Sequence, residues 1–304
     1  MTVVALLVAA LAGGSADASS LRRSQAMPAV VGDGTIEGTV TSASTHSAID
    51  GIEVCAYAPE AEPSCTFTNA AGKYAIAIPP GAYVVEFFSP YGSGLNYVTI
   101  YQGGASSWEE AEAHPLTVTA GGTDSGVDAA MQEGGHISGH VASAAPPESA
   151  IANVEVCAGQ VEGEGFGCGL TDASGDYEIS ALPTGEYLVS FEPPSTGPSF
   201  IGQVHEGPVG VTAGATTTGV EARLALGGEI GGKLTAAPSG GPLPGAQACA
   251  LISETEAVEC APTDEEGDYA LRGLPPRSYA VGLAKPGYQW QYYPSGKVFA
   301  AAEP

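Results

Sequence analysis

Carboxylate oxygens that alternate around a glycine are the first residues of this sequence that could do chemistry. In TDASGDYEI (residues 171–179), Asp172, Ser174 and Asp176 alternate around Gly175, and such oxygens could bind calcium in a short loop. A true EF-hand loop also needs a distant glutamate that binds the ion through both carboxylate oxygens. The other occurrences of this stretch in the chain decide between a calcium loop and a simple turn.

Two further copies of the segment favour a turn. They are TNAAGKY (residues 68–74) and TDEEGDY (residues 263–269), and the first copy has Lys73 where calcium would need a carboxylate. The glycine of each copy supplies the positive φ of a tight turn, and the Asn or Asp three residues before it can bond to its own backbone amides. We therefore predict no metal site, with weak calcium binding in the second and third copies as the alternative.

The cysteines form pairs with nearly constant internal spacing. They are Cys55, Cys65, Cys157, Cys168, Cys249 and Cys260. Many pairings of six cysteines are possible, but the repeated spacing selects one disulfide within each pair. Each bridge would restrict the unfolded chain by about 2.5–3 kcal/mol, a useful stabilisation in an oxidising compartment. Buried free thiols are the alternative, and thiolate metal sites are disfavoured because no Cys-x-x-Cys spacing occurs.

No arrangement of residues in the sequence indicates an active site. His205 and Glu206 open like a zinc-protease motif, but no second histidine follows at the required spacing, and Gly-x-Ser-x-Gly is absent. Glu109, Glu110 and Glu112 cluster in one loop, which is poor evidence for the positioned acid and base of glycoside hydrolysis. We therefore predict a protein that is not an enzyme and that binds no cofactor.

Aromatic residues in two variable segments are the candidates for a binding site. The candidate glycan-binding residues are Tyr97, Tyr101, Trp108, Tyr288, Trp290 and Tyr292. Flat rings can stack on sugar faces, which is the physical reason to consider carbohydrate. The alternative is that about half of them pack inward as strand residues, which the alternation of Tyr288, Trp290 and Tyr292 permits.

Three copies of one unit make up most of the chain and must position these residues. The first cysteines of the pairs lie 102 and 92 residues apart, a spacing typical of autonomous domains in a row. We predict the units at residues 33–133, 134–226 and 227–304. The connections between them are short, which favours a stiff rod over beads on a flexible string.

Apolar and polar residues alternate along short segments of every unit, as they do in β-strands. In the second unit, Tyr177, Ile179, Tyr187, Val189 and Phe191 would all point to the inner face. That unit holds about seven such segments separated by turn signals, which predicts a β-sandwich. The third unit lacks the last strand of the second, so we expect it to be incomplete, with an exposed sheet edge.

The order of these motifs resembles that of the carboxypeptidase regulatory-like domain. The pattern runs from GxIxGxV through the turn TDxxGDY to YxIxxLPxGxYxV. The resemblance implies a transthyretin-like (prealbumin-like) fold related to the CnaB modules of bacterial surface proteins. The predicted fold class is therefore all-β, with three tandem Ig-like/transthyretin-like β-sandwiches, the third truncated. CnaB modules often carry an isopeptide bond from a first-strand lysine to a residue of the last strand. Thr39 and His140 stand where the third unit has Lys233, and the third unit lacks that last strand, so we expect none.

The N-terminus and the charge indicate export. An apolar run from Val3 to Ala12 is followed by small residues, which predicts a signal peptide at residues 1–18 and a flexible segment at residues 19–32, although no Lys or Arg precedes the run. No segment reaches the ~20 apolar residues of a membrane helix, so we expect no membrane insertion of the mature chain. A formal charge of -25 would repel nucleic acid and anionic lipid.

We interpret the chain as a noncatalytic protein that is secreted or held at the cell surface, where it serves in binding, adhesion or spacing. Its expected partners are polysaccharides or surface proteins. The resemblance also implies an alternative, a carbohydrate-binding accessory module of a polysaccharide hydrolase such as an amylase. The fold alone does not choose between these functions.

Overall fold

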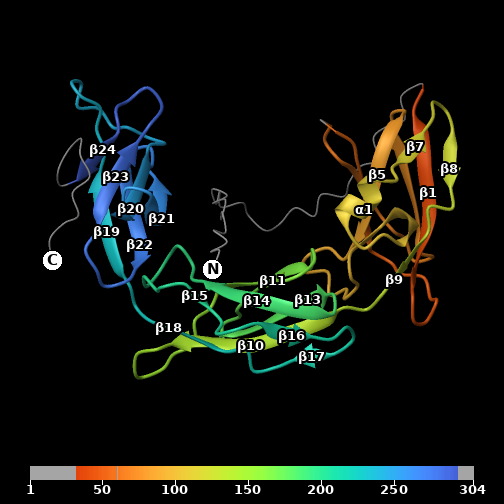
Figure 1. Cartoon of the computed structure of the whole chain (residues 1–304), viewed down its shortest axis with the longest axis horizontal. Helices are drawn as coiled ribbons and strands as arrows, with labels where there is room; N and C mark the ends of the chain where they lie inside the picture. Colours follow the sequence, from red (N-terminus) through yellow and green to blue (C-terminus); the bar gives the residue numbers. More distant parts are fainter. Residues whose placement is uncertain (1–31, 60, 294–304) are drawn as a thin grey trace.

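The computed structural model describes residues 32–59 and 61–293. In these residues the chain is all-β, and its strands form three successive sandwiches of the Ig-like, transthyretin-like class (Figure 1). The predicted signal peptide (residues 1–18) and nearly all of the predicted flexible segment (residues 19–32) lie outside the described residues. No helix in the described part of the chain is long and apolar enough to cross a bilayer.

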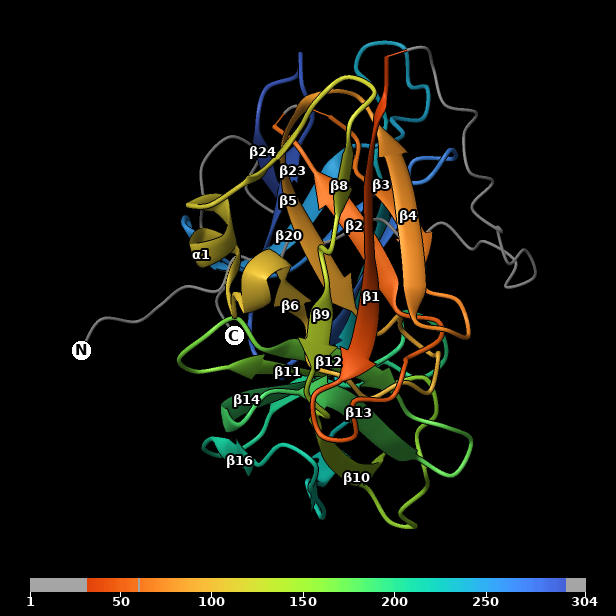
Figure 2. The same ribbon diagram turned by 90° about the vertical axis from the view of Figure 1, so that its right-hand side faces the viewer.

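The first sandwich consists of two sheets. Its strands are β1 (Gly34–Ser42), β2 (Glu53–Tyr57), β3 (Ser64–Phe67), β4 (Lys73–Ile78), β5 (Gly81–Phe88), β6 (Ile100–Tyr101), β7 (Leu116–Val118), β8 (Thr123–Ser125) and β9 (Ala129–Met131). One sheet has the order β4-β1-β8 with β9 also paired to β1, and the other has the order β3-β2-β5-β6 with β7 also paired to β5. Figure 2 shows β1, β4 and β8 in the nearer layer. A 3-10 turn, η1 (Gln102–Gly104), and a short helix, α1 (Trp108–Glu112), lie between β6 and β7.

The second sandwich repeats this topology. Its strands are β10 (Gly135–Ser143), β11 (Glu155–Gln160), β12 (Phe166–Leu170), β13 (Asp176–Leu182), β14 (Gly185–Glu192), β15 (Gln203–Val204), β16 (Val209–Val211), β17 (Thr216–Thr217) and β18 (Ala222–Leu224). The sequence pattern predicts about seven strands here. The structure has more because β16 lies in a segment that reads as a loop and the last predicted strand divides into β17 and β18.

The third sandwich has fewer strands in the described residues. They are β19 (Gly228–Lys233), β20 (Gln247–Ser253), β21 (Glu256–Pro262), β22 (Asp268–Leu274), β23 (Ala280–Ala284) and β24 (Gln291–Tyr293). One sheet holds only β19 and β22, and the other has the order β21-β20-β23-β24. Among residues 227–293 no strand corresponds to β17 or β18, and within these residues β19 pairs with β22 alone.

Alternating side chains of the two sheets build the cores. Tyr177, Ile179, Tyr187, Val189 and Phe191, which the pattern assigns to the inner face, are all 5% exposed or less. The first sandwich buries an equivalent set, whereas the core of the third sandwich is smaller and rich in alanine. Burial of such apolar surface is the main stabilising term of each sandwich.

The cysteines lie on adjacent strands of one hairpin in each sandwich. Three disulfides join Cys55 to Cys65, Cys157 to Cys168 and Cys249 to Cys260. The two cysteines of each pair face each other in the register of the β2–β3, β11–β12 and β20–β21 hairpins. Each bridge therefore ties the edge strand of one sheet to its neighbour.

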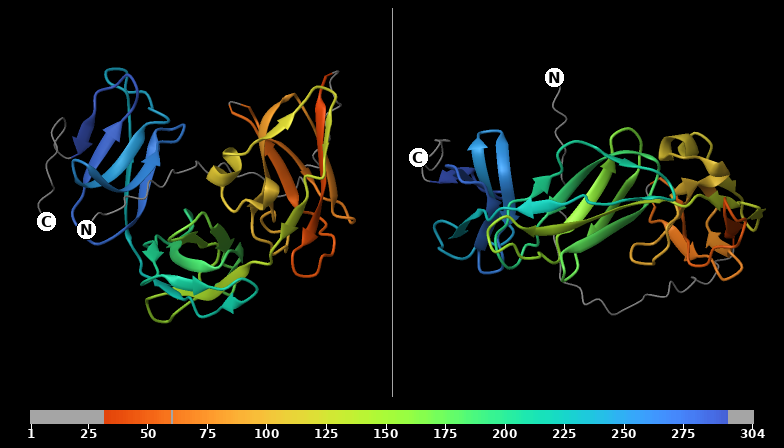
Figure 3. Two further views of the ribbon diagram at one scale, coloured as in Figure 1. Left: turned by 45° about the vertical axis from the view of Figure 1, so that its right-hand side comes forward. Right: turned by 90° about the horizontal axis from the view of Figure 1, so that it is seen from below.

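The three sandwiches form an arch. The first and third sandwiches stand on the same side of the second, at its two ends (Figure 1, and Figure 3, left). Seen from below, the three still follow one another in a row (Figure 3, right). The short connections predict a stiff rod, and the three sandwiches follow a bent path, because the connection at each end of the second sandwich turns the chain direction.

Candidate functional site

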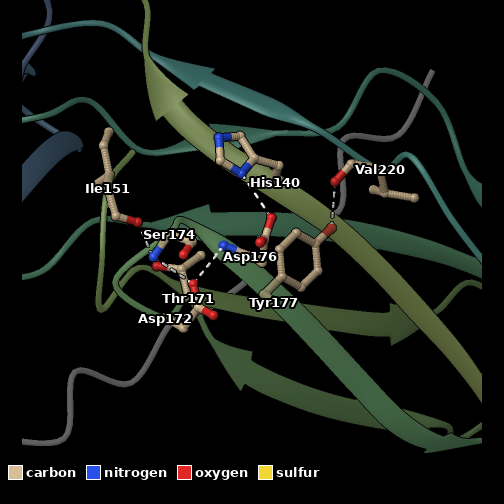
Figure 4. Close-up of polar contacts among 8 residues, drawn as sticks. All are labelled: His140, Ile151, Thr171, Asp172, Ser174, Asp176, Tyr177 and Val220. Carbon is tan, nitrogen blue, oxygen red and sulfur yellow. Dashed lines mark hydrogen bonds and ion pairs between the residues drawn. The ribbon is translucent and has the colours of Figure 1, made fainter. Parts of the chain in front are cut away.

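The repeated turn is held by a buried threonine hydroxyl. In the second sandwich, the Thr171 hydroxyl donates to the Ile151 carbonyl oxygen at 2.7 Å and accepts the Val154 amide at 2.9 Å (Figure 4). Thr171 is only 3% exposed, so both hydrogen bonds are shielded from water. Thr68 and Thr263 make the same two bonds in the other sandwiches. This role of the threonine was not predicted from the sequence, although the residue opens all three copies of the turn segment.

The carboxylate of the turn is bound by its own backbone. Asp172 Oδ1 accepts the amides of Ser174 at 2.7 Å and Asp176 at 3.0 Å, and Gly175 has a φ of 83° (Figure 4). The corresponding Asn69 and Asp264 side chains accept the same two amides in their copies. This geometry is that of a tight turn, which explains the spacing of the oxygen atoms without a metal ion.

A tyrosine hydroxyl binds the segment that leads into the last strand of the sheet. Tyr177 donates to the Val220 carbonyl oxygen at 2.6 Å (Figure 4), and Tyr74 donates to the Val127 carbonyl oxygen at 2.7 Å. A Cβ atom at Gly139 would overlap the Val220 carbonyl oxygen, and one at Gly38 would overlap the Val127 carbonyl oxygen. The sequence assigned the tyrosine only an inward direction, whereas its hydroxyl also fixes the strand that completes the sheet.

The first-strand position considered for an isopeptide bond carries a polar contact. His140 Nδ1 lies 2.9 Å from Asp176 Oδ1 (Figure 4), and Lys233 Nζ lies 2.9 Å from Asp268 Oδ2. Both contacts join the first strand to the turn segment at the surface of the sheet. Exposed pairs of this kind contribute about 0–1 kcal/mol, so they add little to stability.

Two candidate glycan-binding residues of the first sandwich pack against each other edge to face. The rings of Tyr101 and Trp108 have centroids 6.1 Å apart at 87°, and Tyr57 and Trp108 have centroids 5.3 Å apart at 79°. Tyr101 and Trp108 are half-buried over a small apolar cluster that includes Ala111 of α1. The rings therefore fix the β6–β7 loop, and they do not present one flat face.

A groove lies beside these rings, between the first and second sandwiches. Its volume is about 690 Å³, and its lining includes Glu86, Tyr101, Gln132, Gln160, Glu164 and Phe166. Tyr57 donates to Glu86 Oε2 at 2.8 Å. Burial, and then the charges of Glu86 and Glu164, raise the pKa of Tyr101 to about 12.

Tyr97 is separate from the other two candidates and lies at the junction of the sandwiches. It is half-buried on the first core and forms a β-bridge with Glu133. The preceding residue, Asn96, spans the junction: its Nδ2 donates to the Gly134 carbonyl oxygen at 2.8 Å and its Oδ1 accepts the Ala181 amide at 2.6 Å. The Gly134 amide also donates to the Asn96 carbonyl oxygen at 2.9 Å.

The next junction repeats the arrangement with a serine. Ser199 Oγ accepts the Gly273 amide at 2.7 Å and donates to the Gly228 carbonyl oxygen at 3.2 Å. The Gly227 amide donates to the Ser199 carbonyl oxygen at 2.7 Å. Neither Asn96 nor Ser199 was predicted from the sequence, although GLNYV and GPSFI both have a glycine followed two positions later by a polar residue, an aromatic residue and a β-branched residue.

The backbone that each polar residue contacts has an unusual shape. Ala181 has a φ of 61° and Gly273 a φ of 64°, and the strand register shifts beside each of them. A Cβ atom at Gly134 would overlap the Ala181 backbone, and one at Gly227 would overlap the Gly273 backbone. The glycines at these unit starts therefore let the chain that enters each sandwich pass close to this backbone.

A second groove, between the second and third sandwiches, carries two carboxylates. Its volume is about 670 Å³, and its lining includes Glu192 and Glu259. Desolvation, and then the charge of Glu155, raises the pKa of Glu192, and desolvation, and then the charge of Glu192, raises the pKa of Glu259. These carboxylates come from two different sandwiches, so the junction brings like charges toward each other.

The aromatic candidates of the third sandwich are more open. Tyr288 is 48% exposed, Trp290 is 60% exposed, and Tyr292 is half-buried. The rings of Trp290 and Tyr292 have centroids 6.4 Å apart and are tilted by 37°. Of the six candidate residues, this pair comes nearest to an open, shallow aromatic surface.

Comparisons with known proteins identify no family for this chain. No protein-family profile matches it, and no curated protein matches it. Among solved structures, the Bacillus anthracis TIE protein is 16% identical with a TM-score of 0.28, and the match covers 84% of this chain and 46% of that protein. The minor pilin GBS52 of Streptococcus agalactiae is 14% identical with a TM-score of 0.32, covering 63% of this chain and 95% of the pilin.

A Streptococcal ancillary pilin is 10% identical with a TM-score of 0.31, and the match covers 90% of this chain and 96% of the pilin. The chain spans less than half the length of the TIE protein. At TM-scores this low, the likeness does not establish a common function. The assignment of the sandwiches rests on the strand order and register of this chain itself.

Proposed function

We propose that this chain is a noncatalytic spacer and binding protein, secreted or held at the cell surface, that keeps its two outer sandwiches in a fixed arrangement. The observation that carries the proposal is the repeated junction, in which Asn96 and Ser199 each make hydrogen bonds to the start of the next unit. A flexible string of domains would need no such bonds at its connections. The arch then sets the separation of whatever the outer sandwiches bind.

The disulfides support a location outside the cytoplasm. One bridge in each sandwich is typical of secreted domains, since cytosolic proteins keep their thiols reduced. The motif order supports an assignment of the units to the carboxypeptidase regulatory-like type. Surface proteins and polysaccharides are the partners that such a spacer would connect.

Small-angle X-ray scattering of the oxidised chain tests the spacer proposal. We expect the wild-type profile to fit one arch-shaped arrangement at every concentration. The double variant Asn96→Ala, Ser199→Ala should give a larger mean radius and a broader distance distribution, because both junctions lose their side-chain bonds. The single substitution Thr218→Ala, at an exposed residue away from both junctions, is the control. A wild-type profile that needs an ensemble of extended forms would reject a fixed spacer.

Carbohydrate binding is a second candidate, favoured by the open ring pair of Trp290 and Tyr292. A tilted pair with one exposed ring can accept a sugar face, whereas the edge-to-face rings around Trp108 are covered by one another. This candidate would make the chain an accessory module beside a polysaccharide hydrolase. The open ring pair favours the third sandwich, and not the first, as the site of glycan binding.

Affinity electrophoresis distinguishes this candidate from a pure spacer. The oxidised chain is run through gels that contain starch, other glucans or cell-wall polysaccharide. If glycans bind at the third sandwich, the chain is retarded, Trp290→Ala abolishes the retardation and Trp108→Ala keeps it. Equal migration in all gels, with and without polysaccharide, would remove carbohydrate binding as a function.

A further inference from the structure

One sheet of the second sandwich exposes apolar side chains on its outer face. In this sheet, of order β12-β11-β14-β15, Gly159 pairs with Phe166 on one side and with Leu188 on the other. Phe166 is 69% exposed and Leu188 is 47% exposed, and Val204 of β15 is also exposed in the next row of the sheet. Strands β11 and β12 lie in the part of the second sandwich nearest to the first (Figure 2). We call Gly159, Phe166, Leu188 and Val204 the apolar face.

The position of Leu188 is buried in the other two sandwiches. Two residues after Leu188, Ser190 pairs with the first cysteine of the disulfide, and Val84 and Ala280 have the same place in their strands. Val84 is 5% exposed and Ala280 is 1% exposed. Within residues 32–59 and 61–293, the second sandwich alone therefore leaves this position open to solvent.

The first sandwich covers the position with a long connection between strands. The segment between β6 and β7 packs Ala105 and Ala111 against Val84. In the second sandwich only residues 205–208 separate β15 from β16, and Leu188 stays exposed.

The third sandwich covers the position with a side chain from the adjacent strand. The side chain of Leu251 lies over Gly282, where a Cβ atom would overlap it. Gly159 takes the place of Leu251 in the second sandwich, and a Cβ atom there would meet the Phe166 ring at 4.0 Å and no nearer atom of another strand. The lack of a side chain at Gly159 therefore leaves a hollow between Phe166 and Leu188.

Carboxylates stand at both ends of the apolar face. The outward residues of β14 run Glu186, Leu188, Ser190 and Glu192, and the two glutamates lie six residues apart, about 20 Å along the strand. Glu155 pairs with Glu192 across the strands, so like charges face each other at that end. A cation bound there would offset their repulsion.

The nearby cations of the chain are engaged with other carboxylates. Arg223, the only Lys or Arg among residues 134–226, lies on β18 of the opposite sheet with its Nη1 3.4 Å from Glu148 Oε1. Arg272 of the third sandwich lines the groove beside Glu192, but its Nη1 lies 3.3 Å from Glu229 Oε2. The carboxylates around the apolar face therefore form no ion pair within the described residues.

We propose that the apolar face binds a segment of a partner polypeptide in which apolar side chains lie between two Lys or Arg residues. The apolar side chains fill the hollow beside Gly159, and the two cations pair with Glu186 and Glu192. Charge decides between the occupants: a second copy of this chain has a formal charge of -25 and would be repelled, as would an anionic lipid surface. Attraction between opposite charges also raises the rate of encounter with a basic partner.

This surface goes beyond the proposed spacer function and does not rest on it. The apolar face lies on one sheet of the second sandwich, so it would bind its partner even if the junctions were to bend. Loss of the binding site and loss of the fixed arrangement are therefore separate outcomes of separate measurements.

A designed peptide tests the proposal with the full-length, oxidised chain in about 0.15 M salt, which screens attraction between distant charges. The probe is fluorescein-labelled GKTVTLTKG, whose extended form places Lys, Val, Leu and Lys on one side with the two Lys six residues apart. The controls are GETVTLTEG, which reverses the charges, and GKTSTSTKG, which removes the apolar side chains. We expect fluorescence anisotropy to show at least about tenfold tighter binding of the probe than of either control. Equal binding of the probe and a control, or no binding of the probe, would overturn the proposal.

Substitutions at exposed residues locate the site without disturbing a core. Phe166→Ser and Leu188→Ser each remove one wall of the hollow and should weaken binding of the probe by at least about tenfold. Tyr91→Ser, at an exposed ring of the first sandwich, is the matched control and should leave binding unchanged. Binding that survives both Phe166→Ser and Leu188→Ser would contradict a site on this face.

A pair of charge variants tests the two ends of the face. Glu186→Gln with Glu192→Gln should weaken binding by at least about fivefold and flatten its salt dependence, because both ion pairs are lost. Glu265→Gln with Glu266→Gln removes the same charge from an exposed turn of the third sandwich and is the control. An equal loss in both double variants would reveal only a general attraction of basic peptides to an acidic chain, and would reject the site.

Polysaccharide is the alternative occupant of an exposed ring such as Phe166. If Phe166→Ser, and not the charge variant, abolishes retardation of the chain in the polysaccharide gels, the face binds glycan and the polypeptide proposal fails.

Discussion

Single side chains hold the repeated turn of each sandwich, and the sequence predicts only some of them. The bonds from Asp172 to the amides that follow it lie within five residues, so the local motif was enough to predict them. The bonds of Thr171 and Tyr177 reach Ile151 and Val220, which are distant in the sequence. Their partners depend on how the strands pair, and no local pattern contains that information.

Replacement of Thr171 tests the buried hydroxyl. Thr171→Val keeps the shape of the side chain but leaves the Ile151 carbonyl and the Val154 amide without their partner. We expect the free energy of unfolding of the second sandwich to fall by about 1–3 kcal/mol. Denaturant titration followed by fluorescence measures it. The exposed Thr218→Val is the control, and a loss of equal size in that variant would contradict a special role for Thr171.

Alkaline pH tests the buried tyrosines. Burial raises the pKa of Tyr187 to about 12, above the ordinary value of 10.0. Because the folded pKa is the higher one, this contribution to the free energy of unfolding is fully present below pH 10 and is lost as the pH rises toward about 12. We expect stability to fall across that interval, and the fall to be smaller in Tyr187→Phe. Denaturant unfolding at several pH values measures it, and identical pH profiles for the two proteins would contradict the burial effect.

At the scale of elements, long strands were predictable and short ones were not. The alternation along β13 and β14 covers seven or eight residues and defines their inner face. By contrast, β16, β17 and β18 have two or three residues each, too few to show a period of two. These short strands exist because they pair with β14 and β10, which are already in place.

A Gly139→Ala substitution, which adds one methyl group, tests how closely the chain at β18 approaches β10. Gly139→Ala would place a Cβ atom against the Val220 carbonyl oxygen, which Tyr177 also binds. We expect a loss of about 1–3 kcal/mol in the free energy of unfolding, the usual cost of overpacking. Gly210→Ala, whose Cβ atom would meet only the flexible Glu186 side chain, is the control. A Gly139→Ala protein as stable as Gly210→Ala would show that β18 can move away freely.

At the scale of the whole molecule, the sequence predicts three units in a row but not the arch. Short connections limit motion between units, yet they do not reveal the direction of the next unit. That direction depends on Asn96 and Ser199, whose bonds reach backbone groups of a different sandwich. The left-handed conformation of Ala181 and the register shift beside it likewise have no local signal in the sequence.

The most direct test of the account measures the distance between the outer sandwiches. Spin labels on non-canonical amino acids at the exposed positions Asp50 and Glu265 leave the disulfides intact, and double electron–electron resonance reports the distance distribution. We predict one narrow peak in the distance distribution of the native chain and a broad distribution after Asn96→Ala, with the Thr218→Ala distribution unchanged. A broad distribution in the native chain, or a narrow one that Asn96→Ala leaves unaltered, would contradict a spacer held by its junctions.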